Sequence, residues 1–294
     1  MKPNIGVIAR RGSTWLLTLL ITLKFASAIC FAEAGPTPLL QPLSRETVSQ
    51  RLLAAYPGII TRIENNTVTF AGGTTLPLDD GAGLKPIKPW MDHPDIEDMF
   101  NQPYPSGAAS MVPNKDFDPG RARNEAFFVK VYGDCRKFSM DKNLVDVTWL
   151  PKKFGRKLKF SSRNGAAAQL QAVSNELDKL PARFNIDLYP TAGTYNCRKV
   201  AGHTSLSTHA YGIAIDLALK HAHYWRWETR KKGAAIAYLN RVPLDIVHIF
   251  EKHGFIWGGR WYHYDTMHFE YRPELANGAI GPSPVPTPVP APEK

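Results

Sequence analysis

The stretch Ser207-Thr208-His209-Ala210-Tyr211-Gly212-Ile213-Ala214-Ile215-Asp216 has the strongest pattern in the chain, S-x-H-x-x-G-x-A-x-D. Its second half is a short apolar run that predicts a buried strand over 213–217. Gly212 permits a tight turn before this strand, and Ala214 is small enough to pack under an ion. Asp216 lies two residues after Ala214, on the same strand face. Because imidazole nitrogen and carboxylate oxygen both suit zinc, His209 and Asp216 are predicted metal ligands.

A second stretch, Asp265-Thr266-Met267-His268-Phe269-Glu270, offers a third ligand. His268 is expected to come from a distant strand or turn and to complete the site. Three protein ligands leave a fourth position for water, which is typical of catalytic zinc. Asp265 lies close enough to His268 to act as a general base on that water. Glu270 is expected to support the site or, as a less favoured alternative, to be the base.

Arg198 precedes His209 by eleven residues. Its planar guanidinium could hold a substrate carboxylate through two parallel hydrogen bonds. The remaining residues near the motifs give weaker signals. His263 could donate a hydrogen bond in the site or serve only in packing, and Trp227 is better read as core or cleft wall than as a stacking platform.

These motifs resemble the zinc D-Ala-D-Ala carboxypeptidase family, which includes VanX-like dipeptidases, VanY-like carboxypeptidases and phage endolysins that cut L-alanyl-D-glutamate bonds. The resemblance covers roughly residues 187–273, and Trp257-Gly258-Gly259 is similar to the VanY-like and endolysin branches. It implies zinc as cofactor, the stem peptides of peptidoglycan as substrate and a Hedgehog/DD-peptidase-like fold.

The resemblance also implies roles for individual residues. The metal ligands would be His209, Asp216 and His268, and the base would be Asp265. Arg198 and Ser207 match the family's substrate-holding residues by position and type. The base is Asp here, where the VanX-like branch has Glu, and the endolysin-like branch tolerates Asp at this position.

Two other functions compete with a peptidase. Hedgehog signalling domains resemble the same family and keep a similar zinc site without turnover, so a zinc-stabilised envelope-binding or signalling protein is the main alternative. Candidates for both a base and a substrate-binding arginine favour the enzyme. The net charge of +10 raises a third function, nucleic-acid binding. The basic residues are scattered and accompany no nucleic-acid motif, so no nucleic-acid partner is expected.

The first 34 residues have the layout of a secretory signal peptide. Lys2, Arg10 and Arg11 form a basic start, an apolar stretch follows over 15–23, and small-residue cleavage patterns end at Ala28 and Ala34. The protein is therefore expected in the periplasm or cell envelope, with no stable membrane span after cleavage. Cleavage after Ala34 would leave two cysteines, Cys135 and Cys197, and the sequence favours a disulfide and a free pair equally.

The sequence predicts an α+β fold with a mostly antiparallel sheet flanked by helices. Strands are expected within 59–70, over 145–150 and 156–161, and within 257–271, with an extended segment over 188–197. Helices are expected within 35–56, over 166–180, where apolar residues recur at helical spacing, and over 244–253. The domain boundaries follow: signal peptide 1–34, an irregular N-terminal accessory region 35–125, a zinc peptidase domain 126–275, and a Pro-rich, disordered tail 276–294.

Overall fold

The computed structural model describes residues 43–109, 111–137, 140–228 and 236–276. The expected signal peptide, and the expected tail apart from Ala276, lie outside the described residues. The described residues all belong to one compact unit. None of the helices within the described ranges has the length and apolar character needed to cross a membrane.

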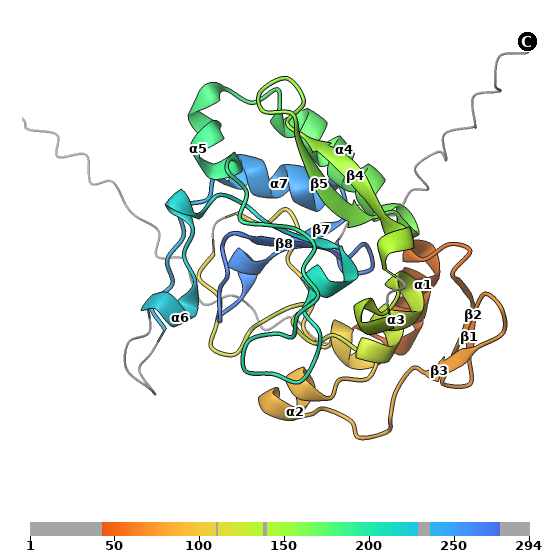
Figure 1. The fold of residues 1–294 in the computed structure, drawn as a ribbon. Coiled ribbons are helices and arrows are strands. Elements are labelled where there is room, and N and C mark those ends of the chain that lie inside the picture. The colour runs from red at the N-terminus through yellow and green to blue at the C-terminus, as the bar shows by residue number, and fades with distance from the viewer. Residues whose placement is uncertain (1–42, 110, 138–139, 229–235, 277–294) are drawn as a thin grey trace, which may run out of the picture. The chain divides into compact units, whose positions relative to one another are not determined.

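The architecture is α+β (Figure 1). The helices are α1 (Arg45–Ala55), α2 (Ile87–Asp92), α3 (Glu125–Tyr132), α4 (Ala166–Leu177), α5 (Asn185–Leu188), α6 (Trp225–Glu228) and α7 (Leu244–Lys252). The strands are β1 (Ile60–Glu64), β2 (Thr67–Phe70), β3 (Thr75–Pro77), β4 (Leu144–Trp149), β5 (Arg156–Ser161), β6 (Ala214–Asp216), β7 (Phe255–Trp257) and β8 (His268–Tyr271).

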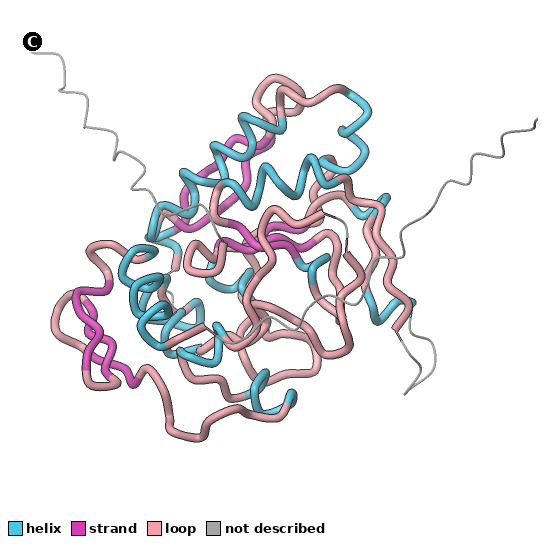
Figure 2. Tube along the Cα trace, turned by 180° about the vertical axis from the view of Figure 1, so that it is seen from behind, coloured by secondary structure: helices cyan, strands magenta, loops and turns pink. Residues whose placement is uncertain are grey.

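The described strands form three antiparallel sheets, ordered β1-β2-β3, β4-β5 and β6-β8-β7, where the sequence suggested one main sheet. The amide of Ser161, at the end of β5, donates to the carbonyl of Gly212 at 2.7 Å and so links the second sheet to the third. Seen from behind, the strands of these two sheets lie next to each other (Figure 2). The β1-β2-β3 sheet lies on the other side of α1.

Local chemistry explains where two of these elements begin or end. Asn65 and Asn66 adopt positive φ angles of 46° and 60° in the two-residue turn that joins β1 to β2, as a tight hairpin requires. Asn124 begins α3 by accepting a hydrogen bond from the Phe127 amide at 2.8 Å. The predicted extended segment over 188–197 is wrong at its start, because Leu188 ends α5 and irregular backbone follows.

Two helices cover the sheets. The Ser174 hydroxyl of α4 accepts from the Leu150 amide just after β4, at 2.7 Å. Phe250 of α7 stacks on Phe269 of β8, with ring centroids 4.0 Å apart. Buried aromatic contacts of this kind fix how a helix sits on a sheet.

The N-terminal region is integrated with the rest of the unit. Tyr56 of α1 packs edge-on against Phe127 of α3 and donates to Glu274 at 2.7 Å. Tyr104 donates to Glu251 of α7 at 2.6 Å. Described residues on both sides of the expected 125/126 boundary therefore share one hydrophobic core.

Candidate metal centre and cleft

Sheet pairing brings two candidate ligands together. Asp216 and His268 are direct partners in the register of β6 with β8. His209 lies on the short 3-10 turn Thr208–Tyr211, where the Ser207 hydroxyl accepts a hydrogen bond from the His209 amide. Gly212 ends this turn with a φ of 66°, and a Cβ there would lie 2.7 Å from Leu144 Cδ2. Glycine is therefore needed for the turn to enter β6 directly beside the hairpin.

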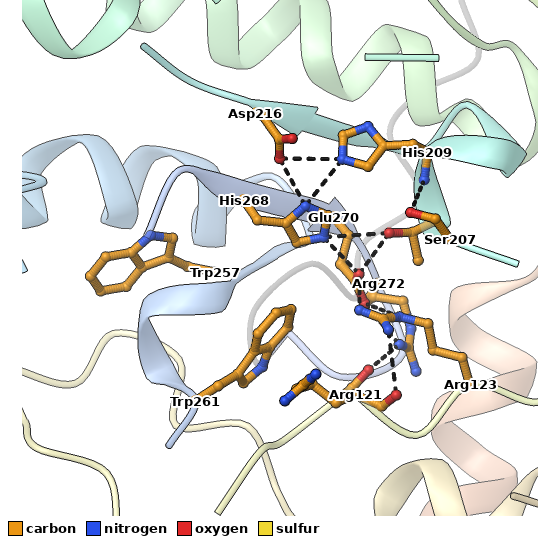
Figure 3. Close-up of polar contacts among 12 residues, drawn as sticks. Arg121, Arg123, Ser207, His209, Asp216, Trp257, Trp261, His268, Glu270 and Arg272 are labelled. Carbon is orange, nitrogen blue, oxygen red and sulfur yellow. Dashed lines mark hydrogen bonds and ion pairs between the residues drawn. The ribbon is translucent and has the colours of Figure 1, made fainter. Parts of the chain in front are cut away.

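Three side-chain atoms converge at one point (Figure 3). Asp216 Oδ1 lies 3.2 Å from His209 Nε2 and 3.0 Å from His268 Nδ1. The two imidazole nitrogens are 3.3 Å apart. Two imidazoles and one carboxylate are a ligand set that suits zinc and leaves a fourth position open, so these residues fit the predicted ion.

The far nitrogen of each imidazole has a partner that orients the ring. His209 Nδ1 contacts the carbonyl of Thr194, and His268 Nε2 lies 3.1 Å from Glu270 Oε2. Because each of these nitrogens faces an acceptor, it carries the N–H group of its ring. His209 Nε2 and His268 Nδ1 then present lone pairs to the point where the three candidate ligand atoms converge. Metal-binding histidines need this arrangement. Burial alone would lower the pKa of His268, but its hydrogen bonds to Asp216 and Glu270 raise the pKa to about 9. Asp216 and Glu270 therefore favour the protonated, positively charged form of the His268 imidazole.

Glu270 joins the metal site to a buried ionic network. Its carboxylate accepts from Arg123 Nη2 at 2.6 Å, from Arg272 Nη1 at 3.0 Å and from Thr208 Oγ1 at 2.9 Å. Burial would raise the pKa of Glu270, but the Arg123 charge and the hydrogen bond to His268 hold it well below its usual range. Glu270 is thus an ionised support for His268, the preferred expectation for this residue.

Asp265 lies in the same cleft as the three ligands. Its Oδ1 is buried and finds no hydrogen-bond partner in the part of the chain that the structure describes. Burial raises the pKa of Asp265 to about 6, and the neighbouring Asp216 charge acts in the same direction. A carboxylate with an unused oxygen beside a metal site is suited to proton transfer.

Glycines hold the Asp265 segment against the protein. A Cβ on Gly258 would lie 2.4 Å from the Asp265 carbonyl oxygen, and one on Gly259 would lie 2.1 Å from the Trp257 ring. The Asp265 amide also donates to the Gly258 carbonyl at 3.0 Å. The Trp257-Gly258-Gly259 sequence therefore allows the close approach that places the second motif.

The cleft has a volume of about 260 Å³. All six candidate residues from the sequence line it: Arg198, Ser207, His209, Asp216, Asp265 and His268. Arg198 is exposed, and its guanidinium donates a long hydrogen bond of 3.4 Å to the Lys199 carbonyl. Trp227 also lines the cleft, in agreement with the cleft-wall interpretation.

Sequence reasoning missed several cleft residues, the most important being Arg121, Arg123 and Trp261. The two arginines belong to the irregular 71–125 region. The only local signal was the Pro-Gly turn in Asp118-Pro119-Gly120-Arg121, which says nothing about the distant cleft.

A disulfide joins Cys135 to Cys197, with the two Cα atoms 5.8 Å apart. This outcome resolves the alternatives that the sequence left open. Cys197 directly precedes Arg198, so the bond ties the cleft rim to the segment after α3.

A second group of acidic residues, Asp79, Asp80 and Asp95, also lies close together. Lys85 Nζ is 2.7 Å from Asp80 and 3.0 Å from Asp95, and Arg45 pairs with Asp79 at 2.6 Å. Protein cations already neutralise this group.

The comparisons with known proteins agree with the cleft chemistry. No curated protein and no solved structure matches the chain significantly. One family model does match, over residues 201–271, and its description is D-alanyl-D-alanine carboxypeptidase. The matched segment contains Ser207, His209, Asp216, Asp265 and His268, and it begins just after Arg198. This part of the chain is therefore similar to the D-alanyl-D-alanine carboxypeptidase family.

Proposed function

We propose that this protein is an exported zinc-dependent peptidase that hydrolyses the stem peptides of bacterial peptidoglycan. Its reaction would be D-Ala-D-Ala carboxypeptidase or L-Ala-D-Glu-type endopeptidase cleavage. The observation that supports this most is the position of Asp265, whose unpartnered Oδ1 lies in one cleft with the convergent atoms of His209, Asp216 and His268. The family similarity over 201–271 supports the same substrate class.

The protein's own residues would divide the work. His209, Asp216 and His268 would hold the ion, and Glu270 would keep His268 in its binding orientation. A zinc ion in such a site lowers the pKa of water and polarises a peptide carbonyl. Asp265 would accept a proton from the attacking water and pass it to the departing amine.

Arg198 and Ser207 are proposed to hold the substrate at the cleft rim. Both line the cleft, and Ser207 also caps the turn that carries His209. Contacts that hold a peptide in reacting position contribute directly to the rate.

Export is part of the proposal. The secretory layout of residues 1–34 supports it, and so does the disulfide between Cys135 and Cys197, because such bonds persist mainly in oxidising compartments.

The test uses purified zinc-loaded protein incubated with muropeptides and followed by mass spectrometry. Release of D-alanine or cleavage within the stem peptide is expected. Asp265→Asn should lower the rate by about 100-fold or more while its zinc content stays that of the wild type. Zinc-loaded protein that leaves every muropeptide intact would contradict the peptidase and favour the zinc-stabilised binding protein instead.

A further inference from the structure

The loop from Asp118 to Arg121 is held by bonds from distant segments. The Tyr262 amide donates to the Phe117 carbonyl at 2.8 Å just before this loop. Within it, the carbonyl of Pro119 accepts from Trp261 Nε1 at 2.7 Å, and that of Gly120 accepts from Arg272 Nη1 at 2.8 Å.

The loop is also fixed by close packing. Gly120 has a φ of 86°, and a Cβ there would lie 2.4 Å from Ile256 Cδ1. Any other residue here would need a left-handed backbone and a shift of the Ile256 side chain. The backbone of the next residue, Arg121, is therefore held in place. The Arg121 side chain extends from it to line the cleft.

Arg121 and Arg123 lie against the same ring but have different partners. Their guanidinium carbons are 5.6 Å and 5.7 Å from the Trp261 ring centroid. Arg123 gives two hydrogen bonds to Glu270, at 3.2 Å and 2.6 Å. Figure 3 shows hydrogen bonds joining Arg123 to Glu270 and none from the Arg121 guanidinium to the other residues drawn.

The Arg121 guanidinium has unused binding capacity. Its Nη1 is buried, and no hydrogen-bond acceptor is found for it among the described residues. Arg121 Nη1 forms a long ion pair with Asp118 Oδ1 at 3.6 Å, which is beyond a hydrogen bond. The hydrogen bonds of the Asp118 carboxylate go to His263, whose amide donates at 2.9 Å and whose Nδ1 lies 2.7 Å away. A buried N–H group without an acceptor is costly, so an anionic acceptor supplied by a ligand would stabilise this position.

We propose that Arg121 binds the C-terminal carboxylate of the substrate peptide, which makes the enzyme a carboxypeptidase rather than an endopeptidase. This inference rests on the proposed peptidase function. The planar fork of an arginine matches a carboxylate, and the Trp261 ring, 5.6 Å from the guanidinium carbon, limits where the fork can lie. The cleft volume of about 260 Å³ is below the roughly 300–1,000 Å³ of typical ligand sites, which suits the end of a peptide.

The test measures binding separately from turnover. Zinc-loaded Asp265→Asn protein is titrated calorimetrically with a synthetic stem peptide that ends in D-Ala-D-Ala, once as the free acid and once as the C-terminal amide. The acid is expected to bind about 10- to 100-fold more tightly. Adding Arg121→Met should remove this preference, and Arg121→Gln serves the same purpose if the Met variant does not fold.

Arg62→Met in the same background is the control, because Arg62 is exposed and does not line the cleft. It should keep the preference for the acid. Arg198→Met is measured as the competing assignment of the carboxylate site. Equal binding of acid and amide by the parent protein, absence of binding by both peptides, or loss of the preference in Arg198→Met but not in the Arg121 variants would each overturn the inference.

Hydrolysis by the wild-type protein is measured in parallel. If the protein binds the acid selectively through Arg121 but hydrolyses neither peptide, the proposed peptidase function is wrong. The proposed carboxylate-binding role of Arg121 is then still supported. Cleavage of interior bonds with no acid preference would refute the carboxylate site and leave the peptidase standing.

Discussion

Asp216 and His268 face each other across β6 and β8, and Asp216 Oδ1 lies 3.0 Å from His268 Nδ1. Two of the three candidate ligands are thus positioned by the register of one strand pair. Since a slip of one residue would turn every side chain of a strand to the opposite face, the register itself preserves the metal centre. Burial of Ile215 and Phe269, which alternate with the ligands, resists such a slip.

Removal of a ligand should abolish stable zinc binding. Asp216→Ala and His268→Ala are expected to lower zinc affinity by more than about 100-fold, since loss of an outer partner alone costs 10- to 100-fold. Metal content after purification, measured by mass spectrometry, checks this result. His248→Ala is the control, because His248 is exposed and outside the cluster. Unchanged zinc content in both ligand variants would show that the ion lies elsewhere.

Glu270→Gln should weaken zinc binding without removing a ligand. The carboxylate lies 3.1 Å from His268 Nε2, and its neutral replacement, which offers one acceptor oxygen and an NH2 group, would favour less strongly the tautomer whose Nδ1 lone pair faces inward. A loss of about 10- to 100-fold in zinc affinity is expected from competition with a chromophoric chelator. Arg45→Gln, which alters an exposed ion pair far along the chain, should leave the affinity unchanged. An affinity for Glu270→Gln equal to that of the wild type would mean that Glu270 does not orient His268.

The convergence of His209, Asp216 and His268 could be predicted because the pattern that brings them together is largely local in sequence. The seven-residue spacing from His209 to Asp216 contains a turn and a strand, and both are readable from Gly212 and the apolar run after it. His268 faces Asp216 because its own short strand pairs with the strand that carries Asp216.

The role of Arg121 could not be predicted in this way. Its segment has no helical or strand period, and its position depends on bonds to Trp261 and Arg272, about 140–150 residues further on. The disulfide was undecided for a related reason, because 62 residues separate Cys135 from Cys197 and such spacing does not fix the distance between two thiols. The separation into three sheets likewise depends on how hairpins pack, which local periodicity does not encode.

Loss of the disulfide should lower stability. It closes a loop across 62 residues, and removal of a bond of this kind typically costs about 2–4 kcal/mol in the free energy of unfolding. Urea unfolding of Cys135→Ser and Cys197→Ser, compared with the wild type, measures the loss. The double variant should be no less stable than either single variant, since one bond is removed in all three. Wild-type protein with the same unfolding midpoint with and without reductant would contradict the prediction.

Asp118 should make stability depend on pH in the acid range. Burial would raise the pKa of Asp118, but the Arg121 charge and the hydrogen bond to His263 lower it below the ordinary 3.8. A carboxyl group whose pKa is lower in the folded state stabilises the fold above its unfolded pKa and loses that contribution as pH falls through the folded value. Asp118→Asn should therefore cost about 1.5–3 kcal/mol near neutral pH, and the difference from the wild type should shrink below about pH 4. Urea unfolding of both proteins from pH 3 to pH 7 tests this, and a difference that stays constant over that range would show that Asp118 acts through packing rather than charge.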